Sequence, residues 1–156
     1  VYTLHICKIV IVAFLSIYPH FKVNRMFSIS LDHFENWLKR YGKAWENGIP
    51  DVTKELFTSD AQYYESPCAP PMTGLAAIYK YWNDNAVVSQ EDVSFSYNLL
   101  AVNENVGLAQ WRAVFKRLPS GNKVTLDGIF KVEFSEDGKC KIFREWWHRI
   151  EEPPVD

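Results

Sequence analysis

The sequence has few of the residues that build disulfide frameworks, metal sites or nucleic-acid surfaces. Its three cysteines, Cys7, Cys68 and Cys140, are an odd number without C-x-x-C spacing, and its four histidines are scattered. Neither a disulfide framework nor a metal site is indicated, and no cofactor is expected. The formal charge of −2 and the lack of a basic cluster interleaved with aromatics argue against nucleic acid as a partner.

Long hydrophobic runs are also missing. The apolar run Ile9–Tyr18 has ten residues, whereas a membrane-spanning helix needs roughly 20, so a membrane is not an expected partner. Residues 1–27 differ from the rest of the chain and permit two interpretations. They are either a signal-peptide core, which predicts secretion, or an extension ahead of Met26 as the natural start, which predicts a cytoplasmic protein.

What the chain has is apolar and aromatic content. Of its 156 residues, 47% are hydrophobic and 15% aromatic, which is enough for one sizeable core but too little chain for two ordinary domains. We therefore predict one domain over residues 28–150, followed by a polar tail at residues 151–156.

The first half of that domain has helical spacing. Over residues 31–45, apolar side chains recur at three- and four-residue steps, with Ser30 as the N-cap and Asn47-Gly48 at the end. A short second helix is expected at residues 51–57, and a third opens after Gly74. Between them, residues 61–65 suit a brief strand, and the proline-rich segment that follows must be an irregular loop.

The second half alternates in the manner of strands. Four long antiparallel strands are predicted at residues 93–103, 106–118, 123–134 and 139–149, joined by turns. This order is an α+β fold, in which a curved antiparallel sheet wraps over three N-terminal helices as a conical, cystatin-like α+β barrel. The concave face of such a sheet leaves a hollow suited to a small apolar molecule.

With these elements in place, the chain resembles the nuclear transport factor 2-like superfamily, in its SnoaL-like and ketosteroid isomerase-like branch. The resemblance covers about residues 31–149. It rests on the element order, the helix that ends in Asn-Gly, the SDA-x-YYE segment, Gly74, and the closing pattern LDG-x-F-x-V-x-F-x-x-DGK. It implies a homologous fold, whereas the superfamily's functions range from acid/base enzymes to noncatalytic binders.

The resemblance implies three catalytic positions. Tyr41 matches the family's helix-one tyrosine, Glu65 stands where the family has its aspartate base, and Asp127 matches its buried aspartic acid. In this scheme Glu65 removes a proton α to a carbonyl, while Tyr41 and protonated Asp127 hold the enolate oxygen. The base is Glu rather than Asp, and Ser66 intervenes before the proline, which places the proton-transfer geometry in doubt.

Each of the three also has a purely structural interpretation. Tyr41 falls on the apolar stripe of its helix and could be a core tyrosine, and Glu65 could accept backbone hydrogen bonds in its loop. The alternation of β-strand residues puts Asp127 on the outer face of the sheet. A bulge at Gly128 would reverse this and point Asp127 inward, and we adopt the bulge as the expectation.

Other residues are expected to line the hollow and contact the substrate. By strand alternation Glu145 lies on the same face as its inward aromatic neighbours. It is either a second candidate acid or base, or one half of an ion pair. Trp146 points the opposite way, which predicts a homodimer formed through the sheet face. The full set of expected substrate contacts is Trp45, Tyr63, Trp82, Trp111, Phe115, Phe143, Glu145 and Trp147.

Two functions follow as competing hypotheses. One is an isomerase or polyketide cyclase-like enzyme that abstracts a proton from an apolar carbonyl compound; the other is a noncatalytic ligand-binding or dimerisation module of the same fold. Chemistry like that of scytalone dehydratase is disfavoured because no histidine lies between His33 and His148, and chemistry like that of limonene epoxide hydrolase because the strands lack Arg-x-Asp.

Overall fold

The computed structural model describes residues 27–154, so the two interpretations of residues 1–26 lie outside it. In chain order its elements are α2 (Leu31–Glu46), the short turn η1 (Pro50–Val52), α3 (Thr53–Leu56), β1 (Phe57–Tyr64), β2 (Met72–Thr73), α4 (Leu75–Trp82), the π-helical turn η2 (Asn83–Val87), β3 (Gln90–Asn103), β4 (Val106–Arg117), β5 (Lys123–Phe134) and β6 (Cys140–Glu152). Within this part of the chain, no helix has the length and apolar character needed to cross a membrane.

Helix α2 forms where the apolar spacing predicts it. The Ser30 side chain accepts a hydrogen bond from the backbone N–H of His33, and Gly48 takes a positive φ of 60° just after the helix. The stripe that the helix buries consists of Phe34, Trp37, Leu38, Tyr41, Gly42, Ala44 and Trp45. This face packs into the concave side of the sheet, so α2 is the centre of the core.

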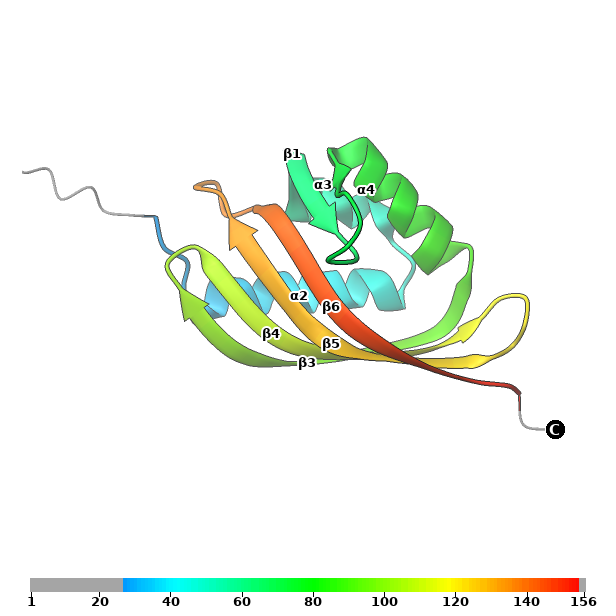
Figure 1. The fold of residues 1–156 in the computed structure, drawn as a ribbon. Helices are drawn as coiled ribbons and strands as arrows, with labels where there is room; N and C mark the ends of the chain where they lie inside the picture. Colours follow the sequence, from blue (N-terminus) through cyan, green and yellow to red (C-terminus); the bar gives the residue numbers. More distant parts are fainter. Residues whose placement is uncertain (1–26, 155–156) are drawn as a thin grey trace, which may run out of the picture.

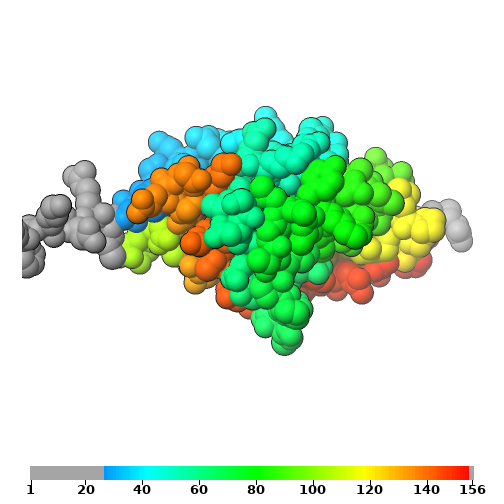
Figure 2. All heavy atoms as spheres, turned by 90° about the horizontal axis from the view of Figure 1, so that it is seen from above, coloured from blue at the N-terminus to red at the C-terminus, as the bar shows by residue number. Residues whose placement is uncertain are grey.

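The sheet has six strands in the order β2-β1-β6-β5-β4-β3. Strands β3 to β6 are antiparallel neighbours, as predicted, whereas β1 runs parallel to β6 and carries the two-residue strand β2 on its other side. The long strands curve beneath α2 (Figure 1), and α4 covers the middle of the molecule when it is seen from above (Figure 2). The predicted α+β class with a curved sheet around the helices is therefore confirmed.

The predicted bulge at Gly128 is absent. The pairing of β4 with β5 runs without a shift from Val106 opposite Glu133 to Lys116 opposite Lys123. Gly128 lies on the concave face, where a Cβ would overlap the carbonyl oxygen of Trp146 and lie 2.8 Å from the Cβ of Trp147. Glycine is needed here because β6 approaches β5 closely at this level, and the bulge interpretation is wrong.

We expect the Gly128→Ala variant to lower the free energy of unfolding by about 1–3 kcal/mol, the usual cost of forcing an extra methyl into a packed site. Urea denaturation would measure the change. Thr125→Ala, on the outward side of the same strand, is the matched control and should stay within about 1 kcal/mol of the unmodified protein. Equal stability of Gly128→Ala and the unmodified protein would contradict this account.

A large aromatic side chain is exposed on the outer face of the sheet. Trp146 is 41% exposed, and Ile150 further along the same strand is 64% exposed. Large apolar side chains on a solvent-facing sheet are typical of subunit contacts. The homodimer through this face stays a prediction.

Candidate functional site

A cavity of about 230 Å³ lies between the helices and the concave face of the sheet. Its walls come from α2, the end of β1, α4 with η2, the start of β3, and the inward side chains of β4, β5 and β6. The lining residues are Tyr41, Trp45, Tyr63, Glu65, Tyr81, Trp82, Asn85, Ala86, Gln90, Trp111, Phe115, Arg117, Leu126, Glu145, Trp147 and Arg149. Half of these residues are aromatic, and carboxyl and guanidinium groups lie at two separate places among them.

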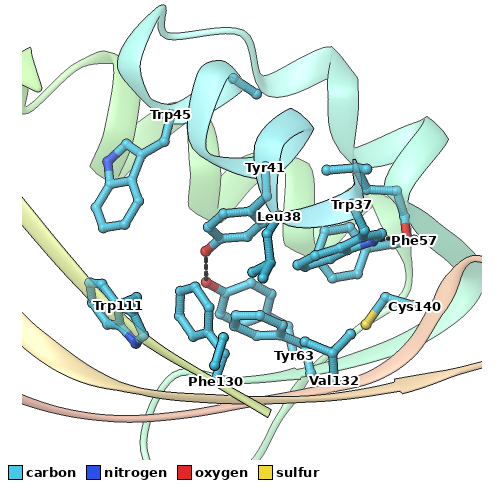
Figure 3. Packing of buried hydrophobic residues seen from close by; sticks show 14 of the residues in the cluster. Trp37, Leu38, Tyr41, Trp45, Phe57, Tyr63, Trp111, Phe130, Val132 and Cys140 are labelled. Atoms are coloured by element: carbon cyan, nitrogen blue, oxygen red, sulfur yellow. Dashed lines mark hydrogen bonds between the residues drawn. The ribbon is translucent and has the colours of Figure 1, made fainter. Parts of the chain in front are cut away.

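Two buried tyrosines and a buried glutamate form a hydrogen-bonded chain. The hydroxyl oxygens of Tyr41 on α2 and Tyr63 on β1 are 3.0 Å apart and point toward each other (Figure 3). The Tyr63 hydroxyl donates to Oε1 of Glu145 at 3.1 Å. The single O–H of Tyr63 is used in the hydrogen bond to Glu145, so Tyr41 must be the donor in its hydrogen bond with Tyr63. Both hydroxyl groups therefore donate in the direction of the carboxyl group.

Glu145 is the most deeply buried carboxyl among the described residues, with 5% of its surface exposed. Burial raises the pKa of Glu145 well above its usual range, the hydrogen bond from Tyr63 opposes this, and the charge of Glu65 raises it further. No ion pair within residues 27–154 includes Glu145. Of its two predicted roles, the candidate acid fits this environment and the ion pair does not.

The two tyrosines are held as neutral donors. Burial raises the pKa of Tyr41 and of Tyr63 well above the usual value, and the nearby charge of Glu145 raises both further. Tyr41 also packs edge-on against Trp82 and stacks on Phe143, with ring centroids 4.9 and 5.6 Å away. The core therefore fixes the direction of the hydroxyl that starts the chain.

Glu65 is a second carboxyl in the same cavity. It directly follows β1 and is only partly buried, so water reaches it more easily than Glu145. Tyr81 of α4 lies beside both: burial raises the pKa of Tyr81 well above its usual value, and the charges of Glu145 and Glu65 raise it further. The cavity thus holds one enclosed and one wetter carboxyl, an arrangement suited to proton transfer in two directions.

The opposite end of the cavity is basic. Arg117 continues the inward face of β4 after Phe115, and Arg149 continues that of β6 after Trp147. Nearby, Trp45 donates a 2.7 Å hydrogen bond to the side-chain oxygen of Gln90. The indole N–H of Trp111 and Nε of Arg117 are buried without a hydrogen-bond partner within residues 27–154.

The structure corrects two of the predicted positions. Asp127 lies on the outer face of the sheet, where it pairs with Arg112 at 3.8 Å and accepts a 3.3 Å hydrogen bond from Gln110. Its side chain is 46% exposed, since strand alternation continues through Gly128 without a bulge. Phe143 is fully buried in the core, 4.5 Å from the Tyr63 ring, and does not line the cavity.

The other predicted positions line the cavity. They are Tyr41, Trp45, Tyr63, Glu65, Trp82, Trp111, Phe115, Glu145 and Trp147. Sequence reasoning missed the other seven lining residues, which are Tyr81, Asn85, Ala86, Gln90, Arg117, Leu126 and Arg149. The sequence does indicate the two arginines, because each follows an inward-facing aromatic residue by two positions and therefore lies on the same face of its strand. Tyr81 had a signal too, since it lies three residues after buried Ile78, on the side of α4 that packs against the core.

Residues 27–154 contain no group of three or more His, Cys, Asp or Glu side chains placed to hold a metal ion. Of the two cysteines in this range, Cys140 is buried and Cys68 exposed, and both are free. The cavity presents carboxyl, hydroxyl, indole and guanidinium groups.

The curved sheet around α2 and the cavity on its concave face define a protein of the nuclear transport factor 2-like class. The chain belongs to the SnoaL-like domain family, whose family model matches residues 38–143. The predicted resemblance is thereby confirmed. A comparison with curated proteins finds no match for the sequence.

Among solved structures, the chain is similar to SalBIII, described as an epoxide hydrolase/cyclase-like enzyme with a role in pyran ring formation in the polyether salinomycin. The two share 19% sequence identity with a TM-score of 0.64, over 73% of this chain and 89% of SalBIII. At this level of identity the similarity establishes the fold.

Proposed function

We propose that the protein is an acid/base enzyme of the isomerase or cyclase type, which binds a small, mostly apolar carbonyl compound in this cavity. The observation that carries the proposal is Glu145: a carboxyl 5% exposed, without an ion pair among the described residues, and hydrogen-bonded by Tyr63 inside a cavity. A structural role alone gives no reason to bury an ionisable group at such cost.

Protonated Glu145 is the acid of the proposed reaction. Its Oε1 accepts the hydrogen bond from Tyr63, which leaves its O–H free to donate to a substrate carbonyl oxygen. As the proton moves to that oxygen, Glu145 becomes a carboxylate, and Tyr63, itself supported by Tyr41, stabilises the new charge. This chain replaces the Tyr41–Asp127 pair that the family resemblance implied.

Glu65 is the base of the same reaction. As a carboxylate it takes the proton from the carbon α to the carbonyl, the C–H electrons form a C=C bond, and the carbonyl oxygen receives the proton of Glu145. With a β,γ-unsaturated substrate, Glu65 then returns the proton to the γ-carbon while the enol O–H gives its proton back to Glu145, which completes an isomerisation. In ring closure the enol carbon instead attacks a second carbonyl, whose oxygen takes the proton from Glu65, and the enol O–H again returns its proton to Glu145. The similarity of the fold to SalBIII, described as cyclase-like, supports this class of chemistry.

Exchange of α-protons tests the proposal without knowledge of the natural substrate. We expect the protein to speed the exchange of α-protons of cyclohexanone and acetophenone with D2O, followed by NMR. Glu65→Gln should slow this by about a hundredfold, within the range of a lost general base. Asp127→Asn, which alters an outer-face carboxyl, is the matched control and should keep the full rate.

The proposal would be overturned if the unmodified protein exchanged α-protons no faster than Glu65→Gln does. It would also be overturned if Asp127→Asn slowed the exchange. Binding of the ketones without exchange would leave the noncatalytic ligand-binding domain as the function of the fold.

A further inference from the structure

The basic end of the cavity has a feature that the proposed reaction does not use. Within residues 27–154, Arg117 and Arg149 share a single acidic partner, Glu151, whose carboxylate oxygens lie 3.6 Å from Nε of Arg117 and 3.8 Å from Nε of Arg149. These separations exceed ordinary hydrogen-bond lengths. Glu151 also accepts a 3.0 Å hydrogen bond from the side chain of Asn122.

Charge is therefore unbalanced at this end. Two guanidinium groups face one carboxylate, which leaves a net positive charge beside an aromatic cavity. The Arg117 side chain is held in place, since its guanidinium lies 5.6 Å from the centre of the Phe115 ring. Its Nε is buried and makes no hydrogen bond within residues 27–154, since the Glu151 oxygen 3.6 Å away is too distant to accept one.

Strand register places the acidic and basic ends on one line. Glu145, Trp147 and Arg149 alternate on the inward face of β6, opposite Phe130, Gly128 and Leu126 of β5. At about 3.3 Å per residue, the Cα atoms of Glu145 and Arg149 are separated by roughly 13 Å. Between them lie the Trp147 ring and the Trp111 indole, whose N–H is buried and unpaired among the described residues.

We propose that the substrate is a carboxylic acid, with its carboxylate bound by Arg117 and Arg149 and its reacting carbonyl at Glu145. This assignment rests on the proposed function and specifies its substrate class as a compact keto acid. The apolar middle of the molecule packs on Trp147 and Leu126, and the Trp111 N–H donates to an oxygen substituent on it. Guanidinium groups suit this role because their planar donors match the two oxygens of a carboxylate.

The volume of the cavity limits the size of the acid. Pockets for drug-sized ligands measure roughly 300–1,000 Å³, and this one is smaller, at about 230 Å³. A one- or two-ring keto acid meets both the volume and the spacing between the two ends.

Matched ligands test the inference. The probes are benzoylpropionate, its carboxamide and its methyl ester, which share a ketone and an apolar body, and of which only the acid is charged. We expect the unmodified protein to bind the acid about 10–100-fold more tightly than either neutral analogue, as measured by quenching of tryptophan fluorescence. Added salt should reduce this preference.

Three variants locate the preference. Arg117→Gln should abolish most of the preference for the acid. Arg149→Gln should also reduce this preference, and because Arg149 is half-exposed the substitution should disturb the fold less. Arg112→Gln on the outer face is the control and should retain the full preference. Circular dichroism would confirm that each variant is folded.

The outcomes separate the two proposals. Equal binding of the acid and the amide, with α-proton exchange of neutral ketones intact, would overturn the carboxylate assignment alone. A preference that survives in both Arg117→Gln and Arg149→Gln would also overturn it. Failure of the protein to bind any of the three probes, together with no exchange of neutral ketones, would overturn the proposed function as well.

Discussion

We expect the Glu145→Gln variant to slow α-proton exchange by about 10²–10⁴-fold, the usual contribution of a positioned acid or base. The amide keeps the size of the side chain and can still accept the hydrogen bond from Tyr63, but it has no acidic proton to give to a carbonyl oxygen. The exchange rate at saturating ketone measures this loss. Ligand affinity should change little, because the amide still fills the same place in the wall.

A second variant distinguishes proton donation from simple packing. Tyr63→Phe removes the hydroxyl that stabilises the Glu145 carboxylate but leaves the acid in place, so we expect a smaller loss of rate than in Glu145→Gln. The pH at which activity falls should also move upward in Tyr63→Phe, because the Tyr63 hydrogen bond lowers the pKa of Glu145. If Glu145→Gln exchanged protons at the full rate, Glu145 would be a structural residue only.

The fold was predictable because its signals are local and periodic. The apolar steps of α2, its Ser30 cap and the two-residue alternation of β4, β5 and β6 each follow from short-range geometry. The parallel pairing of β1 with β6 was not predictable, since it joins segments about 80 residues apart and no nearby pattern encodes the partner of a strand.

The site was predictable only in part, for a reason visible at Asp127 and Glu145. Strand alternation by itself placed Asp127 outward and Glu145 inward, and the structure agrees with that alternation at both positions. The error came from the family resemblance, which required a buried acid at Asp127 and therefore a bulge at Gly128. That glycine serves the close approach of β6, a contact between strands that sequence alone does not reveal.

The hydrogen-bonded chain shows a further limit. Tyr41, Tyr63 and Glu145 come from three elements, and their contact depends on the depth to which α2 sinks into the sheet. Their residue types indicated a polar site, and their 3.0 and 3.1 Å contacts arise only from the packed structure. The unbalanced pair Arg117 and Arg149 likewise becomes visible only when the register of β4 and β6 is known.

The buried acid should also govern how stability depends on pH. The folded pKa of Glu145 lies well above its usual value because of burial, whereas the unfolded chain has a glutamate pKa of about 4.3. Between these two values the folded state holds a proton that the unfolded state has lost. The free energy of unfolding therefore falls as pH rises through this window, by at most about 1.4 kcal/mol per pH unit from this residue.

Comparison with Glu145→Gln isolates this contribution. The amide does not titrate, so the variant should gain stability relative to the unmodified protein as pH rises above about 4.3, and the difference should level off once Glu145 ionises. Exposed carboxyls such as Asp60 and Asp137, whose pKa values are lowered by hydrogen bonds, act in the opposite direction below this range and cancel in the difference. Urea unfolding at half-unit steps from pH 4 to pH 8 would measure it. Parallel curves for the two proteins would mean that Glu145 ionises as easily in the cavity as in water, and the acid of the proposed reaction would then be lost.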